Sequence, residues 1–154
     1  MLRTHLCGSL DTTHIGQKVT LAGWVHSRRD HGKLIFIDLR DRWGLAQIVF
    51  NPETHSKAHA LAEKLRSEFV VRIEGRVRRR PAGTENPKIP TGEIEVDAET
   101  LEILNESPTP PFEISGADDV SEEIRLKYRF LDLRRPEMQE NLKFRYDLIR
   151  LVRE

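Results

Sequence analysis

Hydrophobic and polar residues alternate through most of residues 18–104, which is the pattern of β-strands that bury one face. This period of two predicts five strands, over residues 18–29, 34–41, 44–50, 69–80 and 93–104. The second strand is the clearest case, because Ile35, Ile37 and Leu39 share one face while Phe36 lies on the other. In the first strand, Gly23 suggests a bend or a β-bulge.

The period changes between the third and fourth strands. There the stretch ETHSKAHALAEKLRSE predicts one amphipathic helix of about three to four turns, because its apolar residues recur at helical spacing. These apolar residues are Ala58, Leu61, Ala62 and Leu65. Five strands with a helix between the third and the fourth form the element order of an OB-fold barrel. The sequence therefore predicts a mainly β, five-stranded OB-fold barrel over residues 1–106, with a long loop at residues 81–92.

The composition shifts after the barrel, and we expect a small helical segment there. The stretch SPTPPFEISG (107–116) predicts a stiff, extended linker. A helix is expected over residues 121–130, which Asp119 or Ser121 could cap. A second helix begins at Pro136, a favoured first helical position. Its apolar stripe comprises Met138, Leu142, Tyr146, Ile149 and Val152. Because this helix has no stop signal, we expect the chain to be a fragment of a longer protein.

Phe36 is an aromatic residue on the polar, water-facing side of its strand, beside a hairpin that carries Arg28, Arg29 and His31. An aromatic ring on a basic sheet surface is what an unpaired nucleic-acid base needs for stacking. The alternative is that Phe36 packs under a loop, the helix or a neighbouring domain. Gln47 favours the first interpretation, because it falls on the same outward face of the adjacent strand, where an amide could read a base edge.

A second group of cations runs out of the fourth strand into the following loop, and it comprises Arg76, Arg78, Arg79 and Arg80. Strand parity places Arg78 and Arg80 outward, and we expect Arg28 and Arg29 to contact phosphates. The alternative is an ordinary solvated face, neutralised by acidic residues of the neighbouring strand. A carboxylate within a basic face, such as that of Glu95, can also accept a hydrogen bond from a base amino group.

Composition narrows the function classes. The 25 basic and 25 acidic residues balance, so only local clusters of charge can argue for nucleic acid. The single cysteine, Cys7, excludes a disulfide scaffold and a cysteine-based zinc site. No apolar run approaches the ~20 residues of a membrane span, and no secretory signal is visible, so we expect a cytoplasmic protein. Asp38 and Asp41 are expected to pair with their neighbours Arg40 and Arg42. No catalytic constellation and no metal site are predicted.

Three blocks of the sequence resemble one family, the bacterial-type aspartyl-tRNA synthetases. The blocks are GWVHSRRDHGKLIFIDLRDRWGLAQIVF, TGEIEV and RLKYRFLDLRRPEMQENLK. The resemblance implies an anticodon-binding domain over residues 1–106, a linker and hinge module over 107–135, and the start of a class II catalytic domain over 136–154. The full-length relative would be a homodimer that uses ATP and Mg²⁺ to join aspartate to tRNA. This chain would bind no cofactor and would not be catalytic.

The resemblance also implies roles for particular residues. Phe36 would stack on an anticodon base, Gln47 would read the central U, and Arg29 would contact the anticodon loop. Further anticodon contacts would come from Arg80, Asn86 and Glu95.

His31 and Gly83 resemble the branch of the family that aspartylates both tRNA-Asp and tRNA-Asn. The alternative for both is an ordinary turn residue. The alternative function for the whole chain is a free-standing OB-fold protein that binds single-stranded nucleic acid. Residues 117–154 favour the synthetase, since a generic binder needs neither a hinge nor an open-ended helix.

Overall fold

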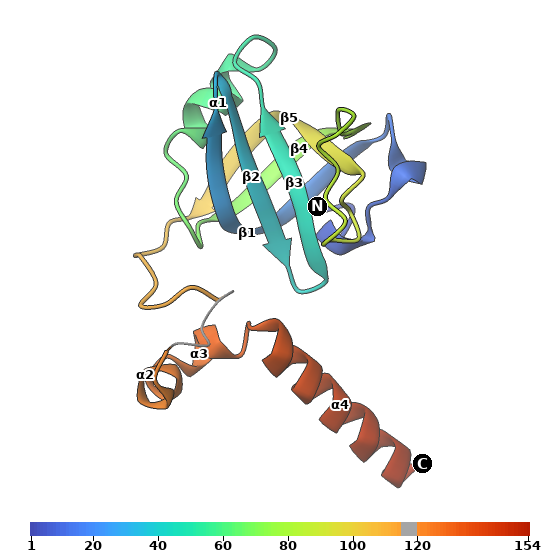
Figure 1. The fold of residues 1–154 in the computed structure, drawn as a ribbon, viewed down its shortest axis with the longest axis vertical. Helices are drawn as coiled ribbons and strands as arrows, with labels where there is room; N and C mark the ends of the chain where they lie inside the picture. The colour runs from blue at the N-terminus through green and yellow to red at the C-terminus, as the bar shows by residue number, and fades with distance from the viewer. Residues whose placement is uncertain (115–119) are drawn as a thin grey trace. The chain divides into compact units, whose positions relative to one another are not determined.

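The computed structural model describes residues 1–114 and 120–154, and its strands form a closed five-stranded barrel (Figure 1). The strands are β1 (Lys18–His31), β2 (Leu34–Asp41), β3 (Gly44–Phe50), β4 (Val70–Arg79) and β5 (Ile94–Asn105). Their order around the barrel is β1-β2-β3-β5-β4, and β4 pairs back onto β1. The β3–β5 pair is parallel and the other pairs are antiparallel. The predicted mainly β, OB-fold class is confirmed.

The barrel interior is filled by the inward residues of all five strands. On β2 every second residue is buried, so Ile35, Ile37 and Leu39 lie in the core while Leu34 and Phe36 stay partly exposed. This alternation is the one that the period-two pattern predicts. Burial of one face therefore fixes which residues of β2 remain on the outer surface.

The irregularity of β1 lies further along the strand than predicted. The register against β2 shifts between Val25 and Ser27, so the β-bulge is not at Gly23. Gly23 instead marks a close approach of two strands, because a Cβ atom there would lie 2.3 Å from the backbone oxygen of Arg40. Such a glycine allows backbone contact without a bulge.

The helix α1 (Ser56–Ala62) is shorter than predicted, at 7 residues. The backbone N–H groups of Lys64 and Leu65 donate to residues three positions earlier, so the chain tightens after Ala62 and leaves the helix. Ala62 and Leu65 lie in the core as expected, but Leu61 is exposed. Leu65 reaches the core from the turn that follows the helix. Its helical spacing in the sequence therefore predicts a helix longer than the one that forms.

The amino-terminal segment before β1 contains two 3₁₀-helices, η1 (Cys7–Ser9) and η2 (Thr12–His14), which pack against the barrel strands. The Cys7 thiol is fully buried, and burial raises its pKa well above the ordinary range. The buried Asp41 carboxylate accepts hydrogen bonds from the backbone N–H groups of Cys7, Trp43 and Gly44. The expected pairing of Asp41 with Arg42 is wrong, since Arg42 instead lies over the Trp43 ring.

The chain divides into two compact units, Met1–Thr109 and Pro110–Glu154. The second unit contains α2 (Glu122–Lys127), α3 (Arg129–Asp132) and α4 (Pro136–Arg153). The single helix predicted over 121–130 is interrupted at Tyr128, which leaves helical geometry with φ −106° and ψ 46°. Ser121 occupies the N-cap position of α2 without a side-chain capping hydrogen bond, and Asp119 lies outside the described residues.

Phe112, Ile114 and Leu131 form the small core of the second unit. The helix α4 begins at Pro136 as predicted, and it buries none of its residues within the described chain. Its expected apolar stripe is therefore open, with Tyr146 and Val152 well exposed. No helix of the described residues has the length and apolar character needed to cross a membrane.

Candidate nucleic-acid interface

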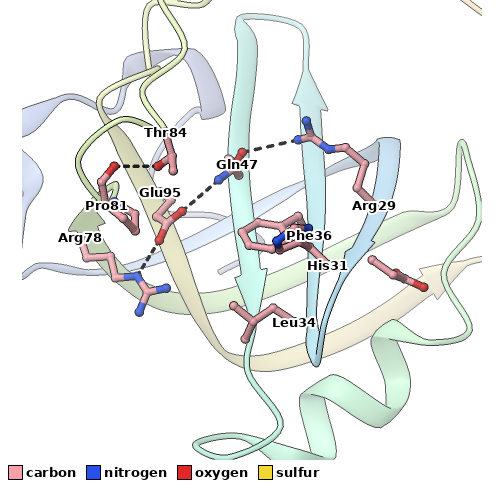
Figure 2. Close-up of a pocket in the computed structure, with 10 residues that line it drawn as sticks. Arg29, His31, Leu34, Phe36, Gln47, Arg78, Pro81, Thr84 and Glu95 are labelled. Carbon is pink, nitrogen blue, oxygen red and sulfur yellow. Dashed lines mark hydrogen bonds and ion pairs between the residues drawn. The ribbon is translucent and has the colours of Figure 1, made fainter.

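A cavity of about 360 Å³ opens on the outer surface of the barrel, where the β1–β2 hairpin faces β3, β5 and the loop after β4 (Figure 2). Its lining residues are Arg29, Asp30, His31, Leu34, Phe36, Gln47, Arg78, Pro81, Thr84 and Glu95. Six of the residues predicted to bind RNA are therefore brought together: Arg29, His31, Phe36, Gln47, Arg78 and Glu95. Four others, Arg28, Arg80, Gly83 and Asn86, do not line this cavity.

Phe36 presents its ring to the cavity, as Figure 2 shows. It lies opposite Arg29 on β1 and opposite Val49 on β3, and its side chain is partly exposed. His31 and Leu34 form the next outward pair toward the hairpin tip. The ring is thus neither buried under a loop nor covered by α1, which leaves a face on which a planar base could stack.

Gln47 is buried, at 8% exposure, and its amide is fixed by its neighbours. The amide Nε2 donates to Glu95 Oε2 at 2.9 Å, and the amide oxygen accepts a long hydrogen bond of 3.5 Å from Arg29 Nη2. Gln47 pairs directly with Asp38 across β2 and β3. Phe36 lies two residues from Asp38 along β2, on the same outward face. The aromatic ring and the amide are therefore diagonal neighbours, close enough for one base to contact both.

Glu95 is on the outward face of β5 as predicted, yet only 2% of it is exposed. Arg78 Nε donates to its Oε1 at 2.8 Å, while Gln47 occupies its other oxygen. Arg78 also lies 3.6 Å from Asp97 Oδ2. The carboxylate is buried with a donor on each oxygen, as a buried charge requires, so it organises the side chains that surround the cavity.

Asp38 has a different partner from the one predicted. Its carboxylate oxygens accept hydrogen bonds from Arg29 Nη2 at 2.9 and 3.0 Å, and Ser27 Oγ donates to it at 2.6 Å. Arg40 instead donates to both oxygens of Glu68, at 2.8 and 2.9 Å. The expected Asp38–Arg40 pair is therefore wrong. The sequence predicts only an ordinary ion pair for Asp38. The register between the strands instead places it beside Arg29 and Gln47.

Arg28 faces away from Phe36, contrary to the prediction that it lies beside the ring. Successive residues of a strand point to opposite faces, so Arg29 reaches the cavity and Arg28 reaches the turn after α1. Arg28 Nη1 donates to the backbone oxygens of Glu63 at 2.5 Å and Leu65 at 3.4 Å. Its guanidinium also binds Asp30, and this hydrogen bond holds the Asp30 pKa below its ordinary value.

Arg80 is only 5% exposed, so it is not the solvent-facing cation that the sequence predicts. The strand β4 ends at Arg79, and beyond that point strand parity no longer applies. Arg80 Nε donates to the backbone oxygen of Ile94 at 2.9 Å, and Nη1 donates to that of Thr84 at 3.5 Å. Burial lowers the Arg80 pKa. Arg80 thus fastens the start of the 81–92 loop, whose residue Thr84 lines the cavity.

Asn86 and Gly83 lie in the same loop but outside the cavity lining. Asn86 lines a separate hollow near Arg79 and Glu93, and its Oδ1 accepts a hydrogen bond from the Lys88 backbone N–H. Gly83 has a φ of +85°, a conformation that glycine adopts readily, and nothing lies within 4 Å of the point where a Cβ atom would be. No cluster of three or more His, Cys, Asp or Glu side chains suited to a metal ion occurs within residues 1–114 and 120–154.

A closed OB barrel with an accessible aromatic ring, a fixed amide and flanking arginines is the form of a nucleic-acid-binding barrel. Residues 19–104 match the model of the OB-fold nucleic acid binding domain of the tRNA anticodon type. The chain belongs to this OB-fold nucleic acid binding domain family.

Relatives of known name match almost the entire chain. The aspartate–tRNA(Asp/Asn) ligase of Halothermothrix orenii is 55% identical over 152 residues, which are 99% of this chain and 26% of that protein. The ligase of the same name from Moorella thermoacetica is 57% identical over 152 residues, 99% of this chain and 25% of that protein. The chain spans about a quarter of the length of these relatives.

The crystal structure of asparaginyl-tRNA synthetase from Pyrococcus horikoshii, complexed with asparaginyl-adenylate, has a similar fold. It superposes with a TM-score of 0.84 at 31% identity, over 99% of this chain and 34% of that one. The similarity therefore extends past the barrel into the helices of the second unit.

Proposed function

We propose that this chain is the anticodon-recognition part of an aspartate–tRNA ligase that acts on tRNA-Asp and tRNA-Asn. The observation that carries the proposal is the placement of the Phe36 ring beside the fixed Gln47 amide in one cavity. Ring and amide supply the two contacts that an unpaired base requires, a stacking surface and a hydrogen-bonding edge. The match to ligases over 99% of the chain favours this function over a free-standing nucleic-acid binder.

In the proposed complex, Phe36 holds the plane of an anticodon base and Gln47 reads the edge of the central U. Arg29 and Arg78, which are 56% and 43% exposed in their side chains, offer charge to the phosphates of the loop. Glu95 holds Gln47 and Arg78 in place. Direct contact of Arg80 or Asn86 with RNA stays a prediction, since neither lines the cavity.

Acceptance of both tRNAs follows from tolerance at the third anticodon letter, where C and U differ. His31 lines the cavity, and Gly83 lies two residues from Pro81 and one from Thr84, which also line it. A glycine with open space around it leaves this part of the loop adaptable. The relatives are named as ligases for both tRNA-Asp and tRNA-Asn, which supports the same tolerance.

The activity of the whole ligase is part of the proposal. ATP and Mg²⁺ would activate aspartate in a catalytic domain outside residues 1–154, and no step of that chemistry is assigned to these residues. The open apolar stripe of α4 would form part of a homodimer interface in the whole protein. The described residues contribute tRNA binding.

Replacement of Phe36 by alanine tests the proposal. Phe36→Ala is expected to weaken binding to an Asp anticodon stem-loop by about 1–3 kcal/mol, because one base loses its stacking surface. Thermal unfolding should change little, since the ring is partly exposed. Titration of a labelled stem-loop measures the first effect, and circular dichroism measures the second.

Trp43→Ala is the matched control, because Trp43 is an aromatic residue with 57% exposure that does not line the cavity. It should leave stem-loop binding unchanged. Equal weakening by the two variants, or unfolding of Phe36→Ala, would show that the Phe36 ring is not a base platform.

A further inference from the structure

Asp38 lies directly opposite Gln47 across the β2–β3 pair, on the outward face that carries Phe36. It does not itself line the cavity, and its side chain is 20% exposed. None of the proposed base contacts involves Asp38. Its position between Ser27, Arg29 and Gln47 nevertheless makes it the anchor of a continuous set of hydrogen bonds.

The hydrogen bonds run from Asp38 through Arg29 to the amide of Gln47. A single guanidinium nitrogen, Arg29 Nη2, donates to both Asp38 oxygens at 2.9 and 3.0 Å, and it lies 3.5 Å from Gln47 Oε1. Ser27 Oγ also donates a hydrogen bond to the Asp38 carboxylate, at 2.6 Å. Without Asp38, the long and 56% exposed Arg29 side chain would have many other positions.

These neighbours determine which way the Gln47 amide points. Arg29 can only donate hydrogen bonds, and the Glu95 carboxylate can only accept them. The Gln47 oxygen therefore faces Arg29, and its nitrogen faces Glu95 Oε2 at 2.9 Å. The reversed amide would set an NH₂ group against a guanidinium and an oxygen against a carboxylate.

The orientation of the amide matters for the choice of base. An amide offers one donor and one acceptor side by side, and uracil and cytosine present these groups in opposite order. Uracil has an N3–H donor beside a carbonyl acceptor, whereas cytosine has an N3 acceptor beside an amino donor. For a base that Phe36 holds in one position, a freely rotating amide can match either pyrimidine, while an amide held in one orientation matches one of them.

We propose that Asp38 is a positioning residue for base discrimination: through Arg29 it holds the Gln47 amide in the orientation that accepts uracil and rejects cytosine. This inference rests on the proposed function, in which Gln47 reads the central U. Asp38 touches no RNA in this account. Its removal should therefore change the preference between bases more than the overall strength of binding.

The test compares stem-loops with U or C at the central anticodon position in a double-mutant cycle of Asp38→Asn and Gln47→Ala. The wild-type chain should prefer U by roughly tenfold or more, and Asp38→Asn should cut that preference by about fivefold. In the Gln47→Ala background, Asp38→Asn should leave the ratio of the two dissociation constants within about twofold. Affinity for an unrelated loop should stay level or rise at low salt, since a negative charge is lost.

Glu74→Gln is the matched control, because Glu74 is another outward carboxylate bound to an arginine, Arg72, and it lies outside the cavity. It should leave the U-to-C preference unchanged. If Asp38→Asn does not fold, Ser27→Ala removes the 2.6 Å hydrogen bond to Asp38 and should lower the preference about twofold.

The outcomes separate this inference from the proposed function. A folded Asp38→Asn that keeps the wild-type preference overturns the positioning role, as does an equal loss of preference with and without Gln47. In the Ser27→Ala arm, an unchanged preference overturns it. A wild-type chain that binds U and C loops equally overturns the proposed function itself.

Discussion

Hydrogen bonds between buried polar side chains, more than exposed cations, fix the shape of the cavity. Gln47, Glu95 and Arg80 are 8%, 2% and 5% exposed, and each is held by hydrogen bonds to its neighbours. Such groups keep one arrangement because an unpaired alternative costs about 1–3 kcal/mol. The cavity is therefore organised before any RNA arrives, which favours selective binding.

Arg80→Ala tests whether this residue supports the loop. The substitution removes the donor for the Ile94 oxygen and empties a buried site, so we expect a loss of about 1–3 kcal/mol in the free energy of unfolding. Urea titration followed by circular dichroism measures it.

Arg79→Ala supplies the comparison, because the adjacent arginine is exposed and lies 4.0 Å from Glu93. It should change the free energy of unfolding by less than about 0.5 kcal/mol. If the two alanine variants are equally stable, Arg80 does not fasten the loop.

Strand parity was sufficient to predict the outward placement of Phe36, Gln47 and Glu95, because each lies within a regular strand. It did not predict the burial of Arg80, which follows the last residue of β4. The same alternation separates Arg28 from its neighbour Arg29, although the sequence predicts phosphate contacts for both. The partner of Asp38 depends on the register of β1 against β2, which the hairpin turn and the β-bulge between Val25 and Ser27 set together.

At the scale of elements, the β1–β2 hairpin is tied to α1 on the side opposite the cavity. Arg28 donates to two backbone oxygens in the turn after α1, and His59 Nε2 lies 3.0 Å from the backbone oxygen of Lys33 at the hairpin tip. The hairpin carries Arg29, His31 and Phe36 on its cavity side. The helix therefore steadies the strand pair that presents these side chains.

Arg28→Ala should loosen this hairpin. We expect faster amide hydrogen exchange at residues 29–36 and a loss of about 1 kcal/mol in stability, since a partly exposed charged donor is removed. Native-state exchange read by mass spectrometry measures the effect.

Arg42→Ala is the control variant. Arg42 lies over the Trp43 ring at the β2–β3 turn, away from the β1–β2 hairpin. Exchange at residues 29–36 should then match the wild type. Unchanged exchange in Arg28→Ala would show that the hairpin is held without α1.

The five strands and their order around α1 were predictable because long alternating segments have one favourable burial pattern. The ends of the helices were not. Leu65 lies in the turn after α1, and its side chain is buried in the core. Tyr128 interrupts the helix predicted over 121–130. In both places apolar spacing persists where the backbone has left the helix, so contacts with the rest of the fold decide the boundary.

At the scale of the whole molecule, charge is balanced and recognition depends on where charge is placed. The chain has 25 basic and 25 acidic residues, yet Arg29, His31 and Arg78 gather around one aromatic ring. A local basic cluster binds any RNA at low salt. Selectivity must therefore come from Phe36 and the Gln47 amide, which contact bases and not phosphates.

The most direct measurement is the dissociation constant of the whole chain for three anticodon stem-loops, those of tRNA-Asp, tRNA-Asn and an unrelated tRNA, at about 0.15 M salt. We predict similar constants for the Asp and Asn loops, which share G and U, and binding at least about tenfold weaker for the unrelated loop. Equal binding of all three loops would contradict recognition of the anticodon. A large preference for the Asp loop over the Asn loop would contradict the tolerance assigned to His31 and Gly83.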